Sequence, residues 1–241
     1  MGTRERRQRE VAEREQLFLD AARSLIREDG LLNLQMSRVA EKCDYAVGTL
    51  YQHFVSKEDL LVALASDQAQ ERVDLFVRVY RAKASTRDRM LGFAVADIVY
   101  ARRRPEHFRL LQFVFTDVIW GATPPARRQA CMEAHAPLRQ AALDLIDEAI
   151  GAGDLDPRGL TPSEICLAPW AMSTGLHAIV HNEGLVEQHQ FAEPYRLMLR
   201  YINDLLNGLG WKPWTDSTDA AALDALAERL CKEVLHESYC A

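Results

Sequence analysis

The chain has 241 residues, of which 48% are hydrophobic and 27% charged, and its formal net charge at pH 7 is −6. This composition is ordinary for a globular protein that buries a sizeable core in one or two domains. The net charge does not indicate a nucleic-acid binder, and residues 1–59 are nearly neutral, with 10 Lys+Arg against 11 Asp+Glu. Any contact with nucleic acid phosphates must therefore come from a few well-placed groups.

The cysteines are odd in number, scattered and never spaced as CxxC: Cys43, Cys131, Cys166, Cys231 and Cys240. This pattern argues against a disulfide scaffold or a zinc ribbon. The N-terminal residues are polar, which excludes a signal peptide. The most apolar later run, residues 166–180, is too short to span a bilayer. We therefore expect a cytoplasmic protein.

The first 85 residues predict helices of different lengths. Residues 1–12 read as a polar, frayed arm, and an apolar period then predicts a helix over 13–29. Two short helices follow at 36–42 and 47–54, joined by a tight turn. Ser56, with an acid three residues later, predicts the capped start of a long helix over 57–80.

The rest of the chain is also predicted to be helical. Prolines suit the helix starts and glycines the helix ends. The expected helices lie at residues 86–103, 106–120, 126–151, 162–182, 191–209 and 218–236. No stretch convincingly alternates as a strand would, although Phe113–Ile119 is ambiguous. We predict an all-α fold, with an arm and helix-turn-helix domain over residues 1–58 and a helical ligand-binding and dimerisation domain over 59–241.

Residues 35–57 have the chemistry of a DNA-reading unit, in which the second of two short helices enters the major groove. Gly48 allows close approach, and Thr49 can hydrogen-bond a base or a phosphate. Tyr51 and His53 offer polar tips to phosphates, and Lys57 adds a charge at a helix N-terminus.

The segment AVGTLYQHFVSKEDLL resembles the signature of TetR/AcrR-type one-component transcriptional regulators, and the resemblance covers about residues 17–64. It implies an operator DNA partner and a set of DNA-contacting residues, namely Gln35, Ser37, Val47, Gly48, Thr49, Tyr51, His53 and Lys57. It also implies that arginines of the arm can enter a minor groove. The departures from the family pattern are Asp44 for the usual turn glycine, Ala46 for a common serine, and Val47 where a cation is frequent.

The helices near residues 162–182 and 191–209 carry apolar residues on more than one face. Because a helix that is apolar on two faces is buried on two faces, one face can serve the core and the other a twin subunit. We expect a homodimer through these helices, as the resemblance also implies. An ordinary internal core is the alternative, and the role of helix 218–236 stays open.

Aromatic and polar residues between the DNA-binding segment and the dimerisation helices predict a chamber for an unknown small-molecule effector. The candidate contacts are Phe93, Asp97, Tyr100, Phe113, Asp117, Trp120, Trp170 and His177. A carboxylate among apolar neighbours needs a partner. Asp97 and Asp117 are therefore expected to pair with Arg102, Arg103 or Arg109, or else to face a polar or cationic ligand.

His177 and His181 share a helix face at a spacing compatible with a metal, but two histidines alone are weak evidence, and we expect neither a metal nor a cofactor. The leading hypothesis is a ligand-responsive dimeric repressor with no catalytic residues, since no GxSxG, P-loop or HExxH motif is present. The alternatives are an all-helical enzyme or carrier, and a protein–protein adaptor that has lost DNA binding. Asp44, Val47 and the near-neutral N-terminal charge favour the adaptor.

Overall fold

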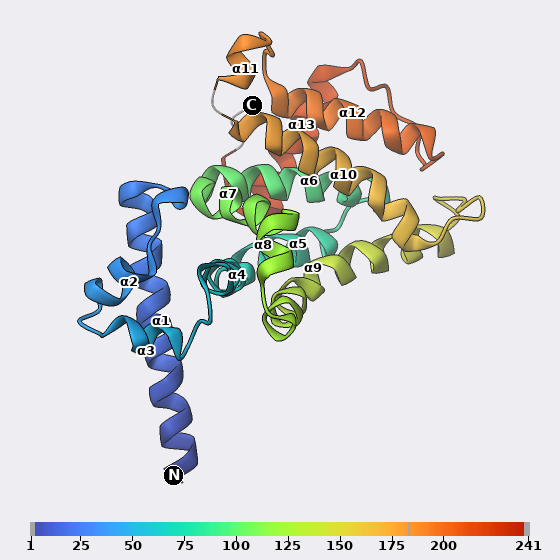
Figure 1. The fold of residues 1–241 in the computed structure, drawn as a ribbon. Helices are drawn as coiled ribbons and strands as arrows, with labels where there is room; N and C mark the ends of the chain where they lie inside the picture. The colour runs from blue at the N-terminus through green and yellow to red at the C-terminus, as the bar shows by residue number, and fades with distance from the viewer. Residues whose placement is uncertain (1–2, 183, 239–241) are drawn as a thin grey trace. The chain divides into compact units, whose positions relative to one another are not determined.

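The computed structural model describes residues 3–182 and 184–238, and every regular element in that part of the chain is helical (Figure 1). The predicted all-α fold is confirmed. The elements are α1 Thr3–Asp29, η1 Leu31–Asn33, α2 Met36–Lys42, α3 Val47–Tyr51, α4 Lys57–Asp67, α5 Ala69–Tyr80, α6 Thr86–Arg103, α7 Pro105–Val114, α8 Asp117–Ala122, α9 Pro125–Gly151, α10 Pro162–His181, α11 Leu185–Gln188, α12 Pro194–Gly208, α13 Ala220–Arg229 and the π-helical turn η2 Leu230–Leu235.

The helices form two compact units. The first unit comprises the chain up to Ala69 together with Glu106–Ala134, and the second comprises Gln70–Pro105 together with the chain from His135 onward. These units do not coincide with the expected division after residue 58, because α4, α7, α8 and the start of α9 group with the helix-turn-helix. The expected division therefore remains a hypothesis about roles rather than about compactness.

Helix α1 begins ten residues earlier than the apolar period indicated, so the expected frayed arm is wrong. Its first turns carry charged residues that form helices well, and the Arg6 guanidinium pairs with the Glu10 carboxylate at 2.9 Å across one turn. Such pairs stabilise a helix without any buried face. In Figure 1 these turns extend past α2 and α3, as a helix and not as an extended arm.

Three other predicted helices are interrupted. The helix expected over 57–80 ends at Asp67, and Gln68 leaves helical geometry (φ −102°, ψ 7°) before α5 begins. Asp67 accepts a hydrogen bond from the Arg23 guanidinium at 2.5 Å, which fixes the end of α4 to α1. The helix expected over 106–120 breaks at Thr116, whose extended backbone caps α8. The helix expected over 218–236 divides into α13 and η2.

An arginine organises the core of the second unit. Arg87 is only 2% exposed, and its guanidinium donates to the Trp211 carbonyl at 2.5 Å and to the Asn203 and Asn207 side-chain oxygens at 2.6 and 2.8 Å. Burial lowers the pKa of Arg87. A buried charge needs such partners, so Arg87 joins α6 to α12 and to the segment after it.

The four described cysteines are free thiols, and Cys240 lies outside the described residues. Over residues 3–182 and 184–238, no helix combines the length and the apolar character needed to cross a bilayer.

Candidate nucleic-acid interface

The turn between α2 and α3 is tight although residues 43–46 include no glycine. Asp44 adopts the left-handed conformation (φ 59°), which aspartate tolerates better than most residues. Its amide donates to the Glu41 carbonyl at 3.0 Å, and the Tyr45 amide donates to the Ala40 carbonyl at 3.0 Å. The predicted turn is confirmed.

The two short helices bury one face each and leave the other exposed. The buried side chains are Met36, Val39, Ala40, Leu50 and Phe54, and the exposed DNA-contact candidates are Gln35, Ser37, Val47, Gly48 and Tyr51. Thr49, His53 and Lys57 are half-buried. Helix α3 ends at Tyr51, earlier than the expected Phe54, which leaves a short reading helix. Gln35 precedes α2 and makes no capping hydrogen bond with its side chain.

Gly48 lies on the exposed face of α3, where a β-carbon would meet no heavy atom within 4 Å. Its φ is outside the left-handed region. Neither packing nor backbone strain within the chain therefore requires glycine at this position. A close approach from outside the chain would require it.

Tyr51 and His53 differ in how freely they can reach a phosphate. Tyr51 is 48% exposed. The His53 imidazole packs edge-on against the Phe18 ring, with the ring centroids 5.4 Å apart, and burial lowers the pKa of His53. A neutral imidazole offers one N–H donor and no positive charge. The structure thus favours Tyr51 over His53 as a phosphate contact.

Lys57 has a partner inside the first unit. Its Nζ donates to the Leu32 carbonyl at 3.0 Å, which ties the start of α4 to η1. The neighbouring cations are also paired: Arg38 with Asp29 at 2.6 Å, and Lys42 with Glu28 at 2.7 Å. Acids of the first unit therefore already partner Arg38 and Lys42.

The sequence analysis did not single out two further residues that lie beside the helix-turn-helix, Tyr45 and Arg14. Tyr45 lies in the turn, is 38% exposed and packs edge-on against Phe18 with centroids 5.4 Å apart. The Arg14 guanidinium carbon lies 5.5 Å from the centroid of the Tyr45 ring. The only sequence signal was the helical register of α1, which carries Arg14 past the turn.

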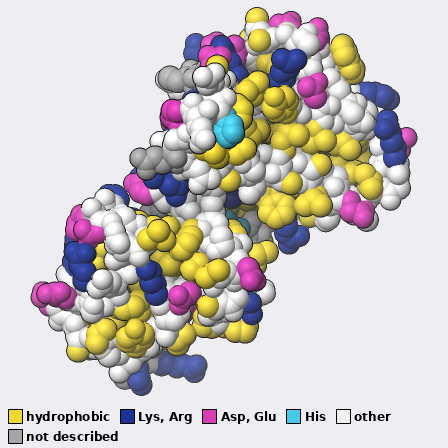
Figure 2. All heavy atoms as spheres, turned by 45° about the horizontal axis from the view of Figure 1, so that its top comes forward, with side chains coloured by type: hydrophobic (Ala, Val, Ile, Leu, Met, Phe, Trp, Pro, Cys, Tyr) yellow, Lys and Arg dark blue, Asp and Glu magenta, His cyan; other side chains and the backbone are white. Residues whose placement is uncertain are grey.

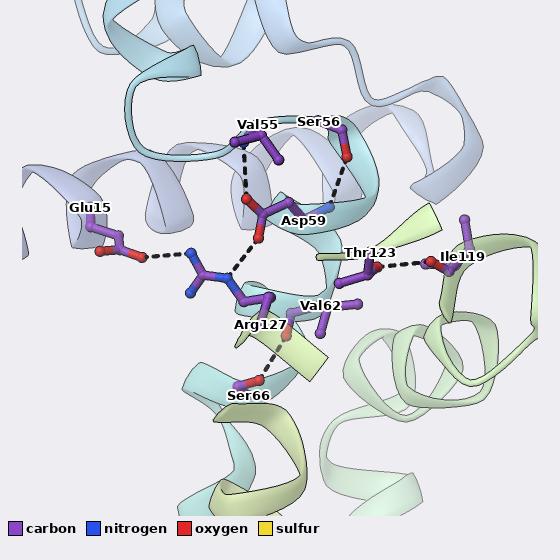
Figure 3. Close-up of polar contacts among 9 residues, drawn as sticks. All are labelled: Glu15, Val55, Ser56, Asp59, Val62, Ser66, Ile119, Thr123 and Arg127. Atoms are coloured by element: carbon purple, nitrogen blue, oxygen red, sulfur yellow. Dashed lines mark hydrogen bonds and ion pairs between the residues drawn. The ribbon is translucent and has the colours of Figure 1, made fainter. Parts of the chain in front are cut away.

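A buried polar network fixes the segment that connects the reading helix α3 to the first turn of α4 (Figure 3). Asp59, 4% exposed, is the third residue of α4, and Ser56 Oγ accepts from its amide at 3.2 Å. One Asp59 carboxylate oxygen accepts from the Val55 amide at 2.9 Å, and the other accepts from Arg127 Nε at 2.7 Å. The predicted cap is confirmed, with Val55 in place of Ser56 as the returning donor.

Arg127 brings the start of α9 into this network, which we call the Asp59 latch (Val55, Ser56, Asp59, Arg127 and Glu15). Its Nη2 lies 3.3 Å from a Glu15 carboxylate oxygen on α1 (Figure 3), and its guanidinium carbon lies 5.4 Å from the Phe54 ring centroid. One side chain therefore contacts α1, the end of the helix-turn-helix and the first turn of α4.

The expected effector contacts divide between the two units. Phe113, Asp117 and Trp120 belong to the first unit, whereas Phe93, Asp97, Tyr100, Trp170 and His177 belong to the second. Asp97 pairs internally as expected, but its partner is Arg72, with Nε 2.9 Å from the carboxylate, and not Arg102, Arg103 or Arg109. The Ser173 hydroxyl lies 3.5 Å from the other Asp97 oxygen.

Two of the expected contacts are exposed. Asp117 begins α8 at the surface, so it is not a buried carboxylate in need of a partner. Trp170 is 61% exposed on α10, whereas His177 of the same helix is fully buried. In contrast, Tyr100 is fully buried and Phe93 stacks on Phe76 with centroids 4.9 Å apart.

His177 and His181 have nearly parallel rings, with centroids 6.0 Å apart. Burial lowers the pKa of His177 to about 4, although the nearby Asp97 carboxylate acts to raise it. Among the residues that the structure describes, no group of three or more His, Cys, Asp or Glu side chains is placed to hold a metal ion.

Comparison with known proteins identifies a family whose sequence model matches this helix-turn-helix. Residues 18–64 match the family model described as "Bacterial regulatory proteins, tetR family". The HTH-type transcriptional repressor KstR of Mycolicibacterium smegmatis is 37% identical over 92 residues, which are 38% of this chain and 45% of that repressor. The match thus spans less than half the length of this curated relative. The resemblance to TetR-type regulators that the sequence indicated is thus confirmed over residues 18–64.

Solved structures show the same fold over most of the chain. FadR from Bacillus subtilis, solved in complex with stearoyl-CoA, aligns with a TM-score of 0.57 at 18% identity, covering 80% of this chain and 96% of that one. A protein of unknown function from Rhodococcus sp. RHA1 aligns with a TM-score of 0.62 at 22% identity, covering 81% and 95%. At these identities the likeness concerns the fold.

Proposed function

We propose that the chain is a dimeric transcriptional regulator that reads operator DNA with α3 and represses until a small molecule releases it. The observation that carries this proposal is the exposed face of α3. There Gly48 is open to an outside partner and Tyr51 projects beside it. The TetR-family match over residues 18–64 supports the same reading.

A helix of five residues makes too few contacts for specific affinity, so two copies must be joined. Helix α10 offers the surface for this. Every fourth residue is buried, namely Ile165, Pro169, Ser173 and His177. The opposite face is apolar or uncharged and exposed, with Leu167, Trp170, Ala171, Thr174 and Gly175.

The exposed apolar surface extends beyond α10. Helix α12 packs against α10 and presents Tyr201, which is 45% exposed. Figure 2 shows hydrophobic side chains gathered over one face of the second unit. Contiguous exposed apolar surface of this kind marks a protein–protein contact. We propose that α10 and α12 pair with their copies in a second subunit, as the sequence predicted.

We propose that the effector acts on the second unit, beside the buried Arg72–Asp97 pair and the stacked Phe76 and Phe93 rings. FadR, which shares the fold, was solved with stearoyl-CoA bound. A ligand shifts the regulator only if it binds the DNA-competent and released states with different affinity. The break at Gln68 means that α4 and α5 form two segments, and not the single helix over residues 57–80 that the sequence predicted.

A polarisation titration on DNA flanking the protein's own gene tests the proposal. Tyr51→Phe removes one exposed hydroxyl from each of two reading helices, so affinity should fall about thirtyfold, because each of the two lost hydrogen bonds costs about 1 kcal/mol. Tyr80→Phe is the control for loss of a tyrosine hydroxyl, since Tyr80 lies in α5 and belongs neither to α3 nor to the helices proposed to pair the subunits. Equal affinity of the two variants would contradict the assignment of α3. An absence of DNA binding in the wild type would favour the adaptor or carrier alternatives.

A further inference from the structure

A cationic groove lies in the second unit, between the end of α5 and the C-terminal helices. Its volume is about 510 Å³, which is within the usual range for small-molecule sites. The cations that line it are Arg78, Arg81, Lys83 and Arg229, and the lining includes one acid, Glu233. The groove is therefore positive in a protein whose net charge is −6.

Among the described residues, only one of the four cations of the groove has an acidic partner. Arg229 lies 3.3 Å from an Asp88 carboxylate oxygen. Within the described part of the chain, Arg78, Arg81 and Lys83 have no such ion pair. All three side chains are exposed. Helix-end cations are often explained by the helix dipole. That explanation suits Arg78 in the last turn of α5, but it does not bring Arg229 from α13 to the same groove.

The floor of the groove is unusual in its backbone. It includes Leu230 and Val234 of η2, a π-helical turn in which residues 230–235 depart from α-helical hydrogen bonding. Leu230 is buried, and it packs against the position of Gly92 on α6. π-Helical turns are rare and frequently occur at functional sites. A rim of arginines above a partly apolar floor suits an organic anion.

We infer that this groove binds a phosphate-bearing small molecule. The planar guanidinium groups of Arg78 and Arg81 can each hold two phosphate oxygens, which makes phosphate a better match than a single carboxylate. Lys83 adds a point charge, and Arg229 closes the opposite side. The site is separate from α3 and from the exposed face of α10, so it does not depend on the proposed operator binding.

Calorimetric titration of the full chain with inorganic pyrophosphate, in a phosphate-free buffer at constant ionic strength, tests the inference. We expect one pyrophosphate per chain with a dissociation constant below about 1 mM, and sulfate should compete only weakly. The double variant Arg78→Ala/Arg81→Ala should weaken binding at least tenfold. Because both side chains are exposed, the variant should fold, and its thermal midpoint without ligand should be close to that of the wild type.

Lys232→Ala is the matched control, because Lys232 is an exposed cation of η2 that does not line the groove. Its pyrophosphate affinity should equal that of the wild type. Equal losses in Lys232→Ala and the double variant, or equal binding of sulfate and pyrophosphate, would show general charge screening and overturn the site. Loss of operator binding in the double variant, with no pyrophosphate bound by the wild type, would assign these cations to DNA and also overturn it.

Discussion

At the scale of single residues, Gly48 is a glycine that the fold does not require but that the close approach of a partner would require. Its missing side chain has no role within the chain, since a β-carbon there meets open space. The residue types of α3 were readable from sequence, but this distinction was not, because it depends on what surrounds the helix. The same is true of Lys57, whose ammonium already has the Leu32 carbonyl as a partner.

Gly48→Ala should therefore stabilise the protein while weakening DNA binding. Replacing a helical glycine by alanine raises the free energy of unfolding by about 0.5 kcal/mol where no strain intervenes. The added methyl group faces the proposed DNA contact, so operator affinity should fall more than about tenfold. Urea unfolding and polarisation on the same samples measure the two effects. A variant that loses stability and affinity together would show that Gly48 serves the fold.

His177 should make stability depend on pH. The native pKa is about 4 and the ordinary value is 6.5, because burial disfavours the charged imidazole. Between these values the unfolded chain binds a proton that the native chain does not. The free energy of unfolding should therefore fall as pH drops from about 6.5 to about 4, by up to about 3 kcal/mol from this residue.

The measurement is a comparison of the wild type with His177→Leu by denaturant unfolding at pH 7 and at pH 4.5. The carboxylates titrate in both proteins, so the difference between the two pH dependences isolates His177. The variant should lose less stability on acidification. Identical pH dependences would refute the assignment of His177 as a buried neutral histidine.

At the scale of elements, the sequence predicted helices best where apolar periodicity is clear, as in α2, or where a capping residue marks the first turn, as at the start of α4. The sequence-based prediction failed where interactions other than apolar burial determine the helix boundaries. Charge pairs, and not apolar residues, support the first turns of α1. No proline or glycine in the sequence marks the break at Gln68 or the π-helical turn η2. The partner of Asp97 came from α5, because distance in space and not in sequence selects ion pairs.

The Asp59 latch makes a prediction about coupled elements. Asp59 and Arg127 form a largely buried pair, with 6% and 24% of their side chains exposed. Removal of one partner leaves a poorly solvated charge, so Asp59→Asn and Arg127→Gln should each lower the free energy of unfolding by about 2–4 kcal/mol. The double variant should lose less than the sum of the two, by about 1 kcal/mol or more.

Chemical denaturation of the wild type, both single variants and the double variant completes this cycle. Additive losses would mean that Arg127 acts through the Phe54 ring or Glu15 and not through Asp59. Operator affinity measured on Arg127→Gln then tells whether the latch positions α3 or only stabilises the first unit.

At the scale of the whole molecule, the proposed operator binding requires two copies of α3 held at a fixed spacing. The chain offers one extended uncharged helix face for this purpose, because α10 has no Asp, Glu, Lys or Arg after Glu164. The sequence showed that this helix carries apolar residues on more than one face. It did not show which face is turned outward, and so it placed Trp170 in the chamber instead of on that surface.

Ala171→Glu should convert the protein to a monomer. Ala171 is exposed in the single chain, so the substitution should change the stability of the subunit by no more than about 0.5 kcal/mol. In a dimer through α10 it would bury two carboxylates near the symmetry axis. Sedimentation analysis should give the single-chain mass for the variant and twice that mass for the wild type. A variant that remains dimeric would move the interface elsewhere.

The central claim is most directly tested by titrating the wild-type chain against labelled DNA flanking its own gene, at several salt concentrations. We predict saturation at two chains per operator or a multiple of two, a linear fall of log affinity with log salt concentration, and binding at least a hundredfold tighter than to shuffled DNA of the same composition. Equal affinity for the flanking and shuffled DNA, or saturation with one chain per site, would contradict the account.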